Sequence, residues 1–478
     1  MTRLNYQTLE SVPETIARGH YERSSYPKVV HLGVGAFHRA HQADYFDRLN
    51  CQIDKPWLIT GASLRSPRAA EQLNPQDGLF LHIARGANTA TTRINRAVTS
   101  VINAFGAPKL LTEAIAQPEV QLVTLTITEK GYCLDSSQTQ LNMSDPDVRA
   151  DCKHLDQPRT AIGHLVAGLS MRYKAGGNPI TVLSCDNLSH NGSCTQRAVL
   201  AMAQIHDEGL FNWIQTHVSF PNAMVDRIAP ALTKKDYQEA QNLLGVADQG
   251  LAVTEQFSQW VIEDNFAGER PPLEKVGVTW VSEVGAWEKR KLRLLNAAHS
   301  ALAYVAGGAN EIFVHTAINQ PCYRDLLEAL WSEVTTTIEE SAEFDRAGYC
   351  KALIDRFSNP HLNHRLLQIA MDGSQKLPPR ILSPLRERLS MDLASPTLTQ
   401  IVAAWCQWVY WYAQKSSELL KDPMAGIFIE AIEAHDERTN FVDTLATVYS
   451  PLGDLMFSYP NWANELRRTV NTPDTKRK

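Results

Sequence analysis

Hydrophobic and polar positions follow two different patterns along the chain. In the first two-thirds, short apolar runs alternate with amphipathic helical patterns, which predicts a parallel β-sheet built from βαβ units. A helix is also expected to begin near His38 and to continue through Leu49. The predicted strands are 28–32, 57–60, 120–127 and 180–184, and the predicted crossover helix before the last strand is 159–173.

After about residue 285, long helical periodicities replace this alternation. Glycine and proline clusters separate them, as expected between helices. A chain of 478 residues is too long for one compact core. We therefore expect an α/β domain over residues 1–285 and a mostly α-helical domain over residues 286–478. The predicted helices of the second domain are 289–305, 323–337, 345–356, 378–389 and 397–413.

Composition and charge narrow the class of protein. The hydrophobic content of 44% and the charged content of 21% are ordinary for a soluble enzyme. A net charge of −6, with both signs mixed along the chain, does not indicate a nucleic-acid partner. The eight cysteines are scattered singly, the first thirty residues lack an apolar signal core, and the apolar stretch 401–413 is too short to span a bilayer. We expect a cytoplasmic protein without a membrane partner; the oligomeric state is left open.

The first predicted strand leads into a glycine turn. Gly33 and Gly35 stand between that strand and a helix, where glycines let the backbone approach a pyrophosphate. The Gly-x-Gly-x-x-Gly fingerprint is incomplete, because His38 occupies the third glycine position, so a plain tight turn is the alternative. As a cofactor site, the turn predicts a Rossmann-type dinucleotide-binding domain over 1–285. The cofactor contacts would be Gly33, Gly35, Phe37 and Arg39.

The end of the second strand normally distinguishes the two nicotinamide cofactors. A carboxylate there bonds the ribose 2′-hydroxyl of NAD, whereas an arginine accepts the 2′-phosphate of NADP. This chain has Arg65 and Arg68 and no acid at that point. Both arginines are either cofactor contacts, with Arg65 the candidate, or ordinary solvated charges. We expect NAD and do not exclude NADP.

Two histidines, His38 and His41, have the spacing of a metal-binding pair. No neighbouring acid or cysteine completes a recognisable ligand set. A position beside a phosphate, with Arg39 as a phosphate contact, explains the segment more simply. We therefore expect no metal.

Polar residues follow three further apolar runs. Glu129 follows the third strand and Asn187 the fourth, and ligands of doubly wound sheets bind at these carboxyl ends. The pair Asp186-Asn187 is either a turn cap or a set of partners for ligand hydroxyls. Asp226 is either the partner of the adjacent Arg227 or a ligand contact.

The stretch from Lys291 to Ser300 places three polar groups on one face of a predicted helix. In an ideal α-helix Lys291, His299 and Asn296 fall at roughly 0°, 80° and 140°. An ammonium, an imidazole and a carboxamide together can move a proton and stabilise an oxyanion without a metal. The alternative is a surface lysine, a capping asparagine and a core histidine.

These segments together resemble the polyol-specific long-chain dehydrogenases, the family of mannitol 2-dehydrogenases and fructuronate reductases. The similarity runs in order from about residue 28 to about residue 384. It is carried by His31–His41, Thr126–Cys133, Ser184–Asn187, Asn191-Gly192, Phe220–Arg227, Trp260–Phe266 and Lys291…Asn296…His299. The resemblance implies a Rossmann-type domain, a helical domain, an active site between them, and metal-independent hydride transfer between NAD(P) and a secondary alcohol.

The resemblance also implies a role for each candidate residue. Lys291 would be the general acid/base, which loses its proton more easily when desolvated. Asn296 and Asn187 would stabilise the oxyanion, and His299 would orient the substrate. Glu129 would take part in proton movement. The substrate contacts implied by the motifs are Asp226, His364, Arg365 and Lys376.

The substrate is harder to predict than the reaction. The runs 187–191 and 220–226 favour the mannitol dehydrogenase branch, whereas His364-Arg365 and the segment through Lys376 favour the fructuronate reductase branch. A uronate carries a carboxylate, for which Arg365, Lys376, Arg380 and Arg293 are candidate partners. We expect interconversion of D-fructuronate and D-mannonate, with D-fructose and D-mannitol as the alternative. A sugar-acid-binding protein without catalysis is the non-enzyme alternative.

Overall fold

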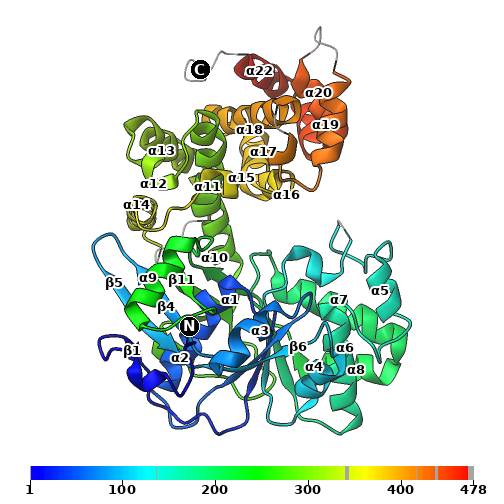
Figure 1. The fold of residues 1–478 in the computed structure, drawn as a ribbon. Helices are drawn as coiled ribbons and strands as arrows, with labels where there is room; N and C mark the ends of the chain where they lie inside the picture. Colours follow the sequence, from blue (N-terminus) through cyan, green and yellow to red (C-terminus); the bar gives the residue numbers. More distant parts are fainter. Residues whose placement is uncertain (1, 136, 340–343, 416, 436–439, 472–478) are drawn as a thin grey trace. The chain divides into compact units, whose positions relative to one another are not determined.

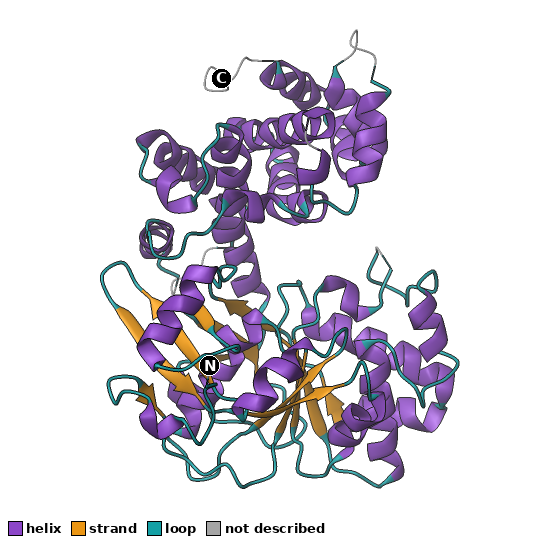
Figure 2. Cartoon of the chain, in the orientation of Figure 1, coloured by secondary structure: helices purple, strands orange, loops and turns teal. Residues whose placement is uncertain are grey.

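The computed structural model describes residues 2–135, 137–339, 344–415, 417–435 and 440–471. The chain divides into two compact units, here called unit 1 (Met1–Gly285) and unit 2 (Ala286–Lys478). Every strand among the described residues belongs to unit 1, and the described part of unit 2 contains only helices and loops (Figures 1 and 2). None of the described helices combines the length and hydropathy that a membrane crossing requires.

A parallel six-stranded sheet forms the centre of unit 1. Its strand order is β6-β3-β2-β7-β8-β9, and all neighbouring strands are parallel. Because the chain order reverses between β2 and β7, the crevice beside their carboxyl ends is the expected ligand position of a doubly wound sheet. The fold class predicted from the sequence is confirmed. The strands are β2 (Val29–Leu32), β3 (Ile59–Ser63), β6 (Val98–Asn103), β7 (Leu122–Leu125), β8 (Ile180–Ser184) and β9 (Val218–Ser219).

Alternate residues of the sheet enter two different cores. Val30, Val123 and Val182 pack with residues of α4, α6, α7 and α8. Val29 and Leu122, one position away, pack on the other side with residues of α2 and α3. This two-residue period is the reason that short apolar runs are sufficient to specify buried strands.

The helices of unit 1 differ from expectation mainly near the glycine turn. The segment predicted as one helix from His38 to Leu49 is two helices, interrupted at His41 with φ −126° and ψ −82°. The unit 1 helices are α1 (Ala36–Ala40), α2 (Gln42–Asn50), α3 (Arg68–Leu73), α4 (Pro108–Ala116), α5 (Pro146–Asp151), α6 (Ala161–Lys174), α7 (Asn191–His206), α8 (Glu208–His217) and α9 (Lys234–Leu244).

Two smaller sheets extend unit 1 and were not predicted. One has the order β1-β5-β4-β11, and the other has the order β10-β12-β13. The strands of the first are β1 (Ala17–Arg18), β4 (Phe80–Arg85), β5 (Ala90–Asn95) and β11 (Ala252–Glu255), and those of the second are β10 (Ala223–Asp226), β12 (Gln259–Glu263) and β13 (Thr279–Val281).

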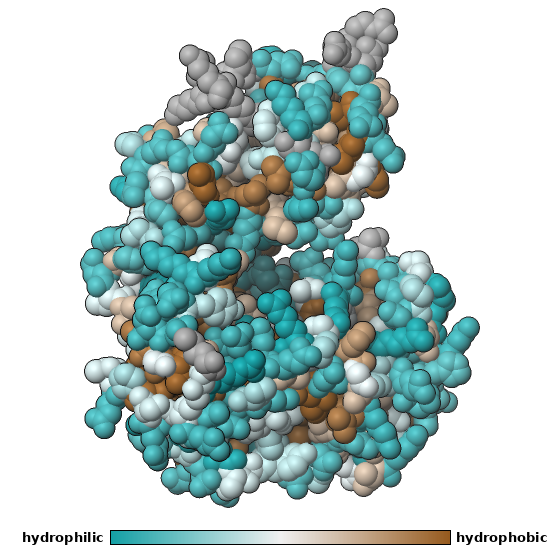
Figure 3. All heavy atoms as spheres, viewed as in Figure 1, coloured by the Kyte–Doolittle hydropathy of each residue, from teal (hydrophilic) through white to brown (hydrophobic). Residues whose placement is uncertain are grey.

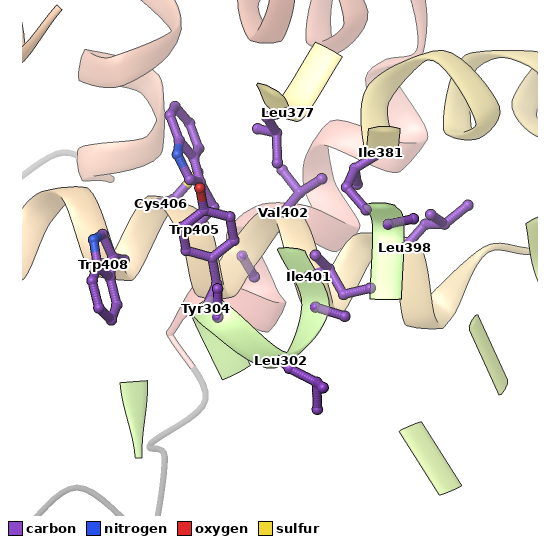
Figure 4. Packing of buried hydrophobic residues seen from close by; sticks show 14 of the residues in the cluster. Leu302, Tyr304, Leu377, Ile381, Leu398, Ile401, Val402, Trp405, Cys406 and Trp408 are labelled. Atoms are coloured by element: carbon purple, nitrogen blue, oxygen red, sulfur yellow. The ribbon is translucent and has the colours of Figure 1, made fainter. Parts of the chain in front are cut away.

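Unit 2 is organised around α18 (Pro396–Lys415). Apolar residues of this helix, among them Ile401 and Trp405, pack against Leu302 and Leu377 in one hydrophobic cluster (Figure 4). The other helices of unit 2 are α10 (Gly285–Arg290), α11 (Ala297–Ala301), α12 (Val314–Ile318), α13 (Pro321–Thr335), α14 (Arg346–Phe357), α15 (Leu366–Ala370), α16 (Gly373–Leu377), α17 (Ser383–Ser390), α19 (Ala425–Glu433), α20 (Phe441–Val448), α21 (Ser450–Ser458) and α22 (Pro460–Val470).

Three segments of unit 2 are π-helical rather than α-helical. They are η5 (Lys291–Asn296), η6 (Leu302–Ala306) and η7 (Pro378–Leu382). π turns are rare and frequently occur at functional sites. Hydrophilic residues cover most of the face of each unit seen in Figure 3, with smaller hydrophobic areas between them.

Candidate cofactor and active site

The glycine turn after β2 has a geometry that requires glycine at its first position. Gly33 has φ +95°, and a Cβ there would lie 2.1 Å from the carbonyl oxygen of Thr126. The hydroxyl of Thr126 donates to the Gly33 carbonyl at 2.7 Å, and the ring Nε2 of His31 lies 3.2 Å from the same oxygen. Strands β2 and β7 therefore hold the turn from two sides.

Glycine at the second position, Gly35, is explained by a different physical reason. A Cβ on Gly35 would come no nearer to the surrounding fold than 3.9 Å, so packing within the protein does not require glycine there. Gly33, Gly35 and Arg39 line a cavity of about 1010 Å³ at the carboxyl ends of the strands. The missing side chain of Gly35 keeps this cavity open, which fits a cradle for the pyrophosphate of a dinucleotide.

Arg39 supplies a buried positive charge at this cavity. Its side chain is 8% exposed, and its Nε has no hydrogen-bond partner among the residues that the structure describes. Burial lowers the pKa of the guanidinium from its ordinary value. A buried cation with an unpaired donor at a cavity wall is suited to an anionic ligand such as a phosphate.

The cavity lining does not include the three aromatic residues that follow the turn, Phe37, His38 and His41. His38 stacks on His31 with ring centroids 3.5 Å apart, and His41 lies 3.0 Å from the carbonyl oxygen of Gln259 through its Nε2. Phe37 stacks on His41 at 5.1 Å. The expectation that the two histidines lie beside a phosphate is therefore corrected, because both are buried in the core of unit 1. Within the described chain there is no group of three potential metal-binding side chains.

The cavity wall beyond β3 is basic. Arg65 and Arg68 line it, together with Ser63 at the strand end. The acids that line the cavity, Asp145 and Asp147, lie instead at the start of α5. The described wall near β3 thus has guanidinium groups where NAD-specific proteins carry a carboxylate.

The side chain of Asp186, which follows β8, bonds to the turn that follows β7. Glu129 begins the short 3₁₀ helix η3 (Glu129–Tyr132), and both Glu129 and Asn187 are exposed. The carboxylate of Asp186 accepts the backbone N–H of Ile127 at 2.8 Å and of Thr128 at 3.0 Å. Asp186 thus caps the turn after β7, and Asn187 is its neighbour in the chain.

Asp226 lies at the end of β10 and is 4% exposed. The adjacent Arg227 pairs with a different acid, because its Nη1 lies 2.9 Å from Oδ2 of Asp44. Asp226 also pairs across the ladder with Gln259 of β12. A ligand contact by Asp226 stays a prediction.

In unit 2, the predicted polar helix face lies on a π turn. Lys291 and Asn296 are the first and last residues of η5, and His299 follows in α11. All three are buried, with exposed fractions of 9%, 5% and 8%. Positions calculated for an α-helix do not apply across this segment, because a π turn bonds residues five apart. The estimated directions of the three side chains are corrected on this account.

His299 and His364 form a pair of neutral imidazoles. Their ring centroids are 5.2 Å apart in an edge-to-face arrangement, and Phe357 lies 4.7 Å from His299. Burial is the main cause that lowers the pKa of His299 well below its ordinary value and that of His364 to about 4. Nε2 of His299 has no hydrogen-bond partner among the described residues. A ligand hydroxyl would satisfy it.

Three cations act on His299, and one of them, Lys376, also acts on His364. After burial and His364, the charges of Arg380, Arg356 and Lys376 contribute most to lowering the pKa of His299. Nη1 of Arg380 donates to the hydroxyl of Ser300 at 3.3 Å, and Nζ of Lys376 donates to the carbonyl of Met371 at 2.6 Å. Neutral imidazoles among fixed cations form an environment suited to an anionic, hydroxylated ligand.

Two other arginines were proposed from the sequence as substrate contacts. Arg365 is exposed, and its guanidinium carbon lies 5.7 Å from the ring centroid of Phe313. Arg293 is 4% exposed and donates to both carboxylate oxygens of Glu387. Arg293 is therefore committed to an ion pair, and we no longer consider it a substrate contact.

Sequence reasoning did not identify Arg356 or the role of Asp186. Arg356 is the penultimate residue of α14, where its charge resembles an ordinary solvated one in the sequence. Only the fold brings it close enough to act on His299. Asp186 was recognised as a possible turn cap, but its partners were not predictable from its neighbours in the chain.

A second cavity of about 1180 Å³ lies in unit 2 beside α18 and α22. Tyr304, Gln407 and Trp462 are among the residues that line it. Nε1 of Trp462 donates to the hydroxyl of Thr399, and the side chain of Gln407 donates to the Val470 carbonyl. None of the candidate residues lines this cavity.

Comparison with known proteins agrees with this geometry. Residues 27–275 match the model of the mannitol dehydrogenase Rossmann domain, and residues 283–458 match that of the mannitol dehydrogenase C-terminal domain. The chain belongs to the mannitol dehydrogenase family of oxidoreductases. The family models follow the division of the chain into unit 1 and unit 2.

Relatives in this family include enzymes with different substrates in their names. The chain is 39% identical to D-mannonate oxidoreductase of Escherichia coli over 86% of each protein. It is 36% identical to mannitol 2-dehydrogenase of Cereibacter sphaeroides over 83% of this chain and 84% of that one. A solved Pseudomonas fluorescens mannitol 2-dehydrogenase, in a ternary complex with NAD and D-mannitol, has a TM-score of 0.89 at 33% identity and covers 98% of this chain and 96% of its own.

Proposed function

We propose that this member of the mannitol dehydrogenase family is an NAD-dependent, metal-independent oxidoreductase that interconverts D-fructuronate and D-mannonate in the cytoplasm. The observation that carries the substrate choice is the group of Arg380, Arg356 and Lys376 around the neutral pair His299 and His364. A uronate presents a carboxylate and several hydroxyls. The cations suit the carboxylate, and the unpaired Nε2 of His299 suits a hydroxyl.

The identity of 39% to a D-mannonate oxidoreductase supports the same choice. D-Fructose and D-mannitol remain the second candidate pair, since mannitol 2-dehydrogenases are similar at 36% identity. These substrates carry no charge and gain little from three cations. The two candidates therefore differ in how strongly they depend on unit 2 arginines.

The residues of unit 1 fit a nicotinamide dinucleotide. Gly35 leaves room that a Cβ would fill, and Arg39 offers a buried guanidinium with an unpaired Nε. When bound, NAD supplies the hydride acceptor for the alcohol and NADH the hydride donor for the ketone. The dinucleotide-binding role of unit 1 and the substrate-binding role of unit 2 are both parts of this proposal.

NADP is a second candidate cofactor on the strength of one observation. Arg65 and Arg68 line the cavity wall near β3, and that wall has no carboxylate among its described residues. A guanidinium can accept a 2′-phosphate, whereas a carboxylate would repel it. NADPH therefore belongs in any assay of this protein.

The proposed chemistry needs a base and donors for a developing oxyanion. Lys291 takes the proton of the substrate hydroxyl as hydride leaves the carbinol carbon, and Asn296 and Asn187 donate N–H groups to the oxygen. Removing water from around an ammonium favours the neutral amine that such a base requires. Glu129 moves the proton onward, and Asp226 contacts the substrate.

The test is an oxidation assay with NADH and NADPH on D-fructuronate, D-tagaturonate and D-fructose in parallel. We expect the highest kcat/KM with D-fructuronate and NADH. A response to D-fructose alone would replace the proposed substrate by the mannitol pair. If the folded protein oxidised neither cofactor with any of the three, while still binding a sugar acid by calorimetry, it would be a binding protein.

A further inference from the structure

Thr128 has a backbone conformation that threonine rarely adopts. Its φ is +65° and its ψ is 163°, a region that is essentially restricted to glycine. A residue is held there only when its surroundings fix it. Because Thr128 immediately precedes Glu129, its conformation sets the direction in which the chain of Glu129 leaves the end of β7.

The side chain of Asp186 makes the bonds that hold this conformation. Its Oδ1 accepts the N–H of Thr128 at 3.0 Å, and its Oδ2 accepts the N–H of Ile127 at 2.8 Å. The phenol of Tyr132, at the far end of η3, donates to Oδ2 at 2.6 Å. One carboxylate thus holds both ends of the segment 127–132, which contains Glu129.

The same residue is tied to the segment that carries Asn187. The backbone oxygen of Asp186 accepts the side-chain N–H of Asn191 at 3.1 Å, and Asn191 also donates to the backbone oxygen of Ala223 at 2.7 Å. Asn191 begins α7, so this bond fixes the turn from β8 into that helix. Asp186 therefore lies between two anchored loops.

We propose that Asp186 is a positioning residue: its carboxylate holds Thr128 in this positive-φ conformation and so fixes the position of Glu129 relative to Asn187. This inference rests on the function proposed above, because that function gives Glu129 and Asn187 their roles. Asp186 itself contacts neither substrate nor cofactor in this scheme. It acts through the backbone that it holds.

A carboxylate is required here because every bond is one that it accepts. An asparagine would offer one accepting atom and would present N–H groups to a donor on the other side. Burial raises the pKa of Asp186, and the bonds from Tyr132, Ile127 and Thr128 oppose that change. Burial and the charge of Asp186 raise the pKa of Tyr132 well above its ordinary value, so the phenol keeps the proton that it donates.

The first experiment is Asp186→Asn in the full-length protein, with two measurements. Hydrogen exchange over residues 126–133 should accelerate, because asparagine has a single accepting oxygen and at least one of the amides of Ile127 and Thr128 loses its acceptor. The kcat for the substrate identified in the panel should fall roughly 10- to 100-fold, since small misplacements of catalytic groups have effects of that size. Cofactor affinity should change much less than kcat.

The second experiment distinguishes positioning from a general loss of stability. Glycine adopts the conformation of Thr128 without steric cost, so Thr128→Gly should recover part of the lost kcat in the Asp186→Asn protein, whereas amide exchange should stay fast because the acceptor is still missing. A stability defect elsewhere would not respond to this change. Glu333→Gln is the matched control, because Glu333 is buried and accepts the consecutive amides of Thr397 and Leu398 in unit 2. This control should lower the melting temperature and leave kcat unaltered.

Each outcome decides the inference. Faster exchange at 126–133 in Asp186→Asn, together with a loss of kcat that Thr128→Gly partly restores, supports it. Unchanged exchange, or a kcat within twofold of the wild type, overturns it, as does a double variant in which kcat is not recovered. If the wild-type protein has no activity on the panel, the proposed function fails, and hydrogen exchange alone still decides whether Asp186 holds Thr128.

Discussion

The candidate residues of the two units are held in different ways. In unit 1, they stand at strand ends and are fixed through the backbone, as Gly33 and Asp186 illustrate. In unit 2, they project from helices, and their surroundings are dominated by burial and by the charges around His299. Substitutions in unit 1 should therefore act mainly by changing the backbone geometry of the site. Substitutions in unit 2 should act mainly by changing its charges. Four predictions test this contrast, in order of expected effect.

The largest effect is expected from Lys291, the proposed acid/base residue of unit 2. Lys291→Ala removes the proposed base and should lower kcat by about 10²- to 10⁴-fold, the usual range for general acid–base catalysis. NADH affinity, measured by fluorescence, should be retained because the cavity proposed for the cofactor lies in unit 1. Lys351→Ala, which removes an exposed lysine of the same unit, is the control. Near-normal turnover in Lys291→Ala would contradict the assignment.

The two glycines of unit 1 should respond oppositely to an added side chain. Gly35→Val should leave stability almost unchanged but weaken NADH binding by about tenfold or more, because the new side chain fills the cavity. Gly33→Ala should instead destabilise the protein by at least about 1–3 kcal/mol, since a Cβ at its φ is strained and meets the Thr126 oxygen.

Thermal unfolding and NADH titration of both proteins measure this difference. Similar losses of stability in the two variants would mean that Gly35 is structural too, and the cavity would then lack its proposed cradle. Equal NADH affinity in wild type and Gly35→Val would exclude the glycine turn as the pyrophosphate site.

The cations of unit 2 should affect the KM of acidic substrates more than that of neutral substrates. Arg380→Met should raise KM for D-fructuronate about tenfold and leave KM for D-fructose within about twofold, because only the first has a carboxylate to lose a partner. Arg365→Met is the comparison, since its guanidinium lies over Phe313. An equal change in KM for both substrates would show that Arg380 acts on hydroxyls or on the fold.

The smallest effect concerns acid. The folded pKa of His364 is lowered to about 4 by burial, so between its ordinary value of 6.5 and about 4 the unfolded chain binds the extra proton. The contribution of His364 to stability is therefore fully present above about pH 6.5 and is lost as the pH falls toward 4. The difference in unfolding free energy between pH 7.5 and pH 5, measured in urea, should be smaller in His364→Gln. An identical pH dependence would show that His364 is not the group involved.

The parts of the fold that were predictable are those with a local signal. β8 and α6 follow directly from an apolar run and a helical period. The small sheets were missed because strands such as β5 are rich in threonine and partly exposed. β4 and β5 form a local hairpin, but the pairings that complete this sheet, β4 with β11 and β5 with β1, join segments far apart in the chain. Where tertiary contacts set the register of a strand, its sequence has no alternating hydrophobic pattern from which the strand could be predicted.

The candidate site shows the same division. Gly33 was predictable because a glycine between a strand and a helix is itself a local signal for a tight turn. The structure has the positive φ that such a turn requires. The arrangement of Lys291 and Asn296 was not, because six residues of π-helix have no distinctive composition, and arithmetic for an α-helix is the natural assumption. Arg356 could not be found either, since its effect on His299 arises across elements far apart in the chain.

The π turn from Lys291 to Asn296 also has a consequence for tracing ancestry. A π turn differs from an α turn by one extra residue, so deleting one residue here would restore the α-helix and rotate everything before it by about 100° relative to Asn296 and His299. The number of residues between Lys291 and Asn296 therefore sets the relative directions of the two side chains. For comparing relatives, this number is more informative than the identity of the residues between them. In an alignment, a one-residue gap inside this segment indicates a different placement of Lys291 relative to Asn296 and His299, whereas the same gap in a surface loop indicates no such change.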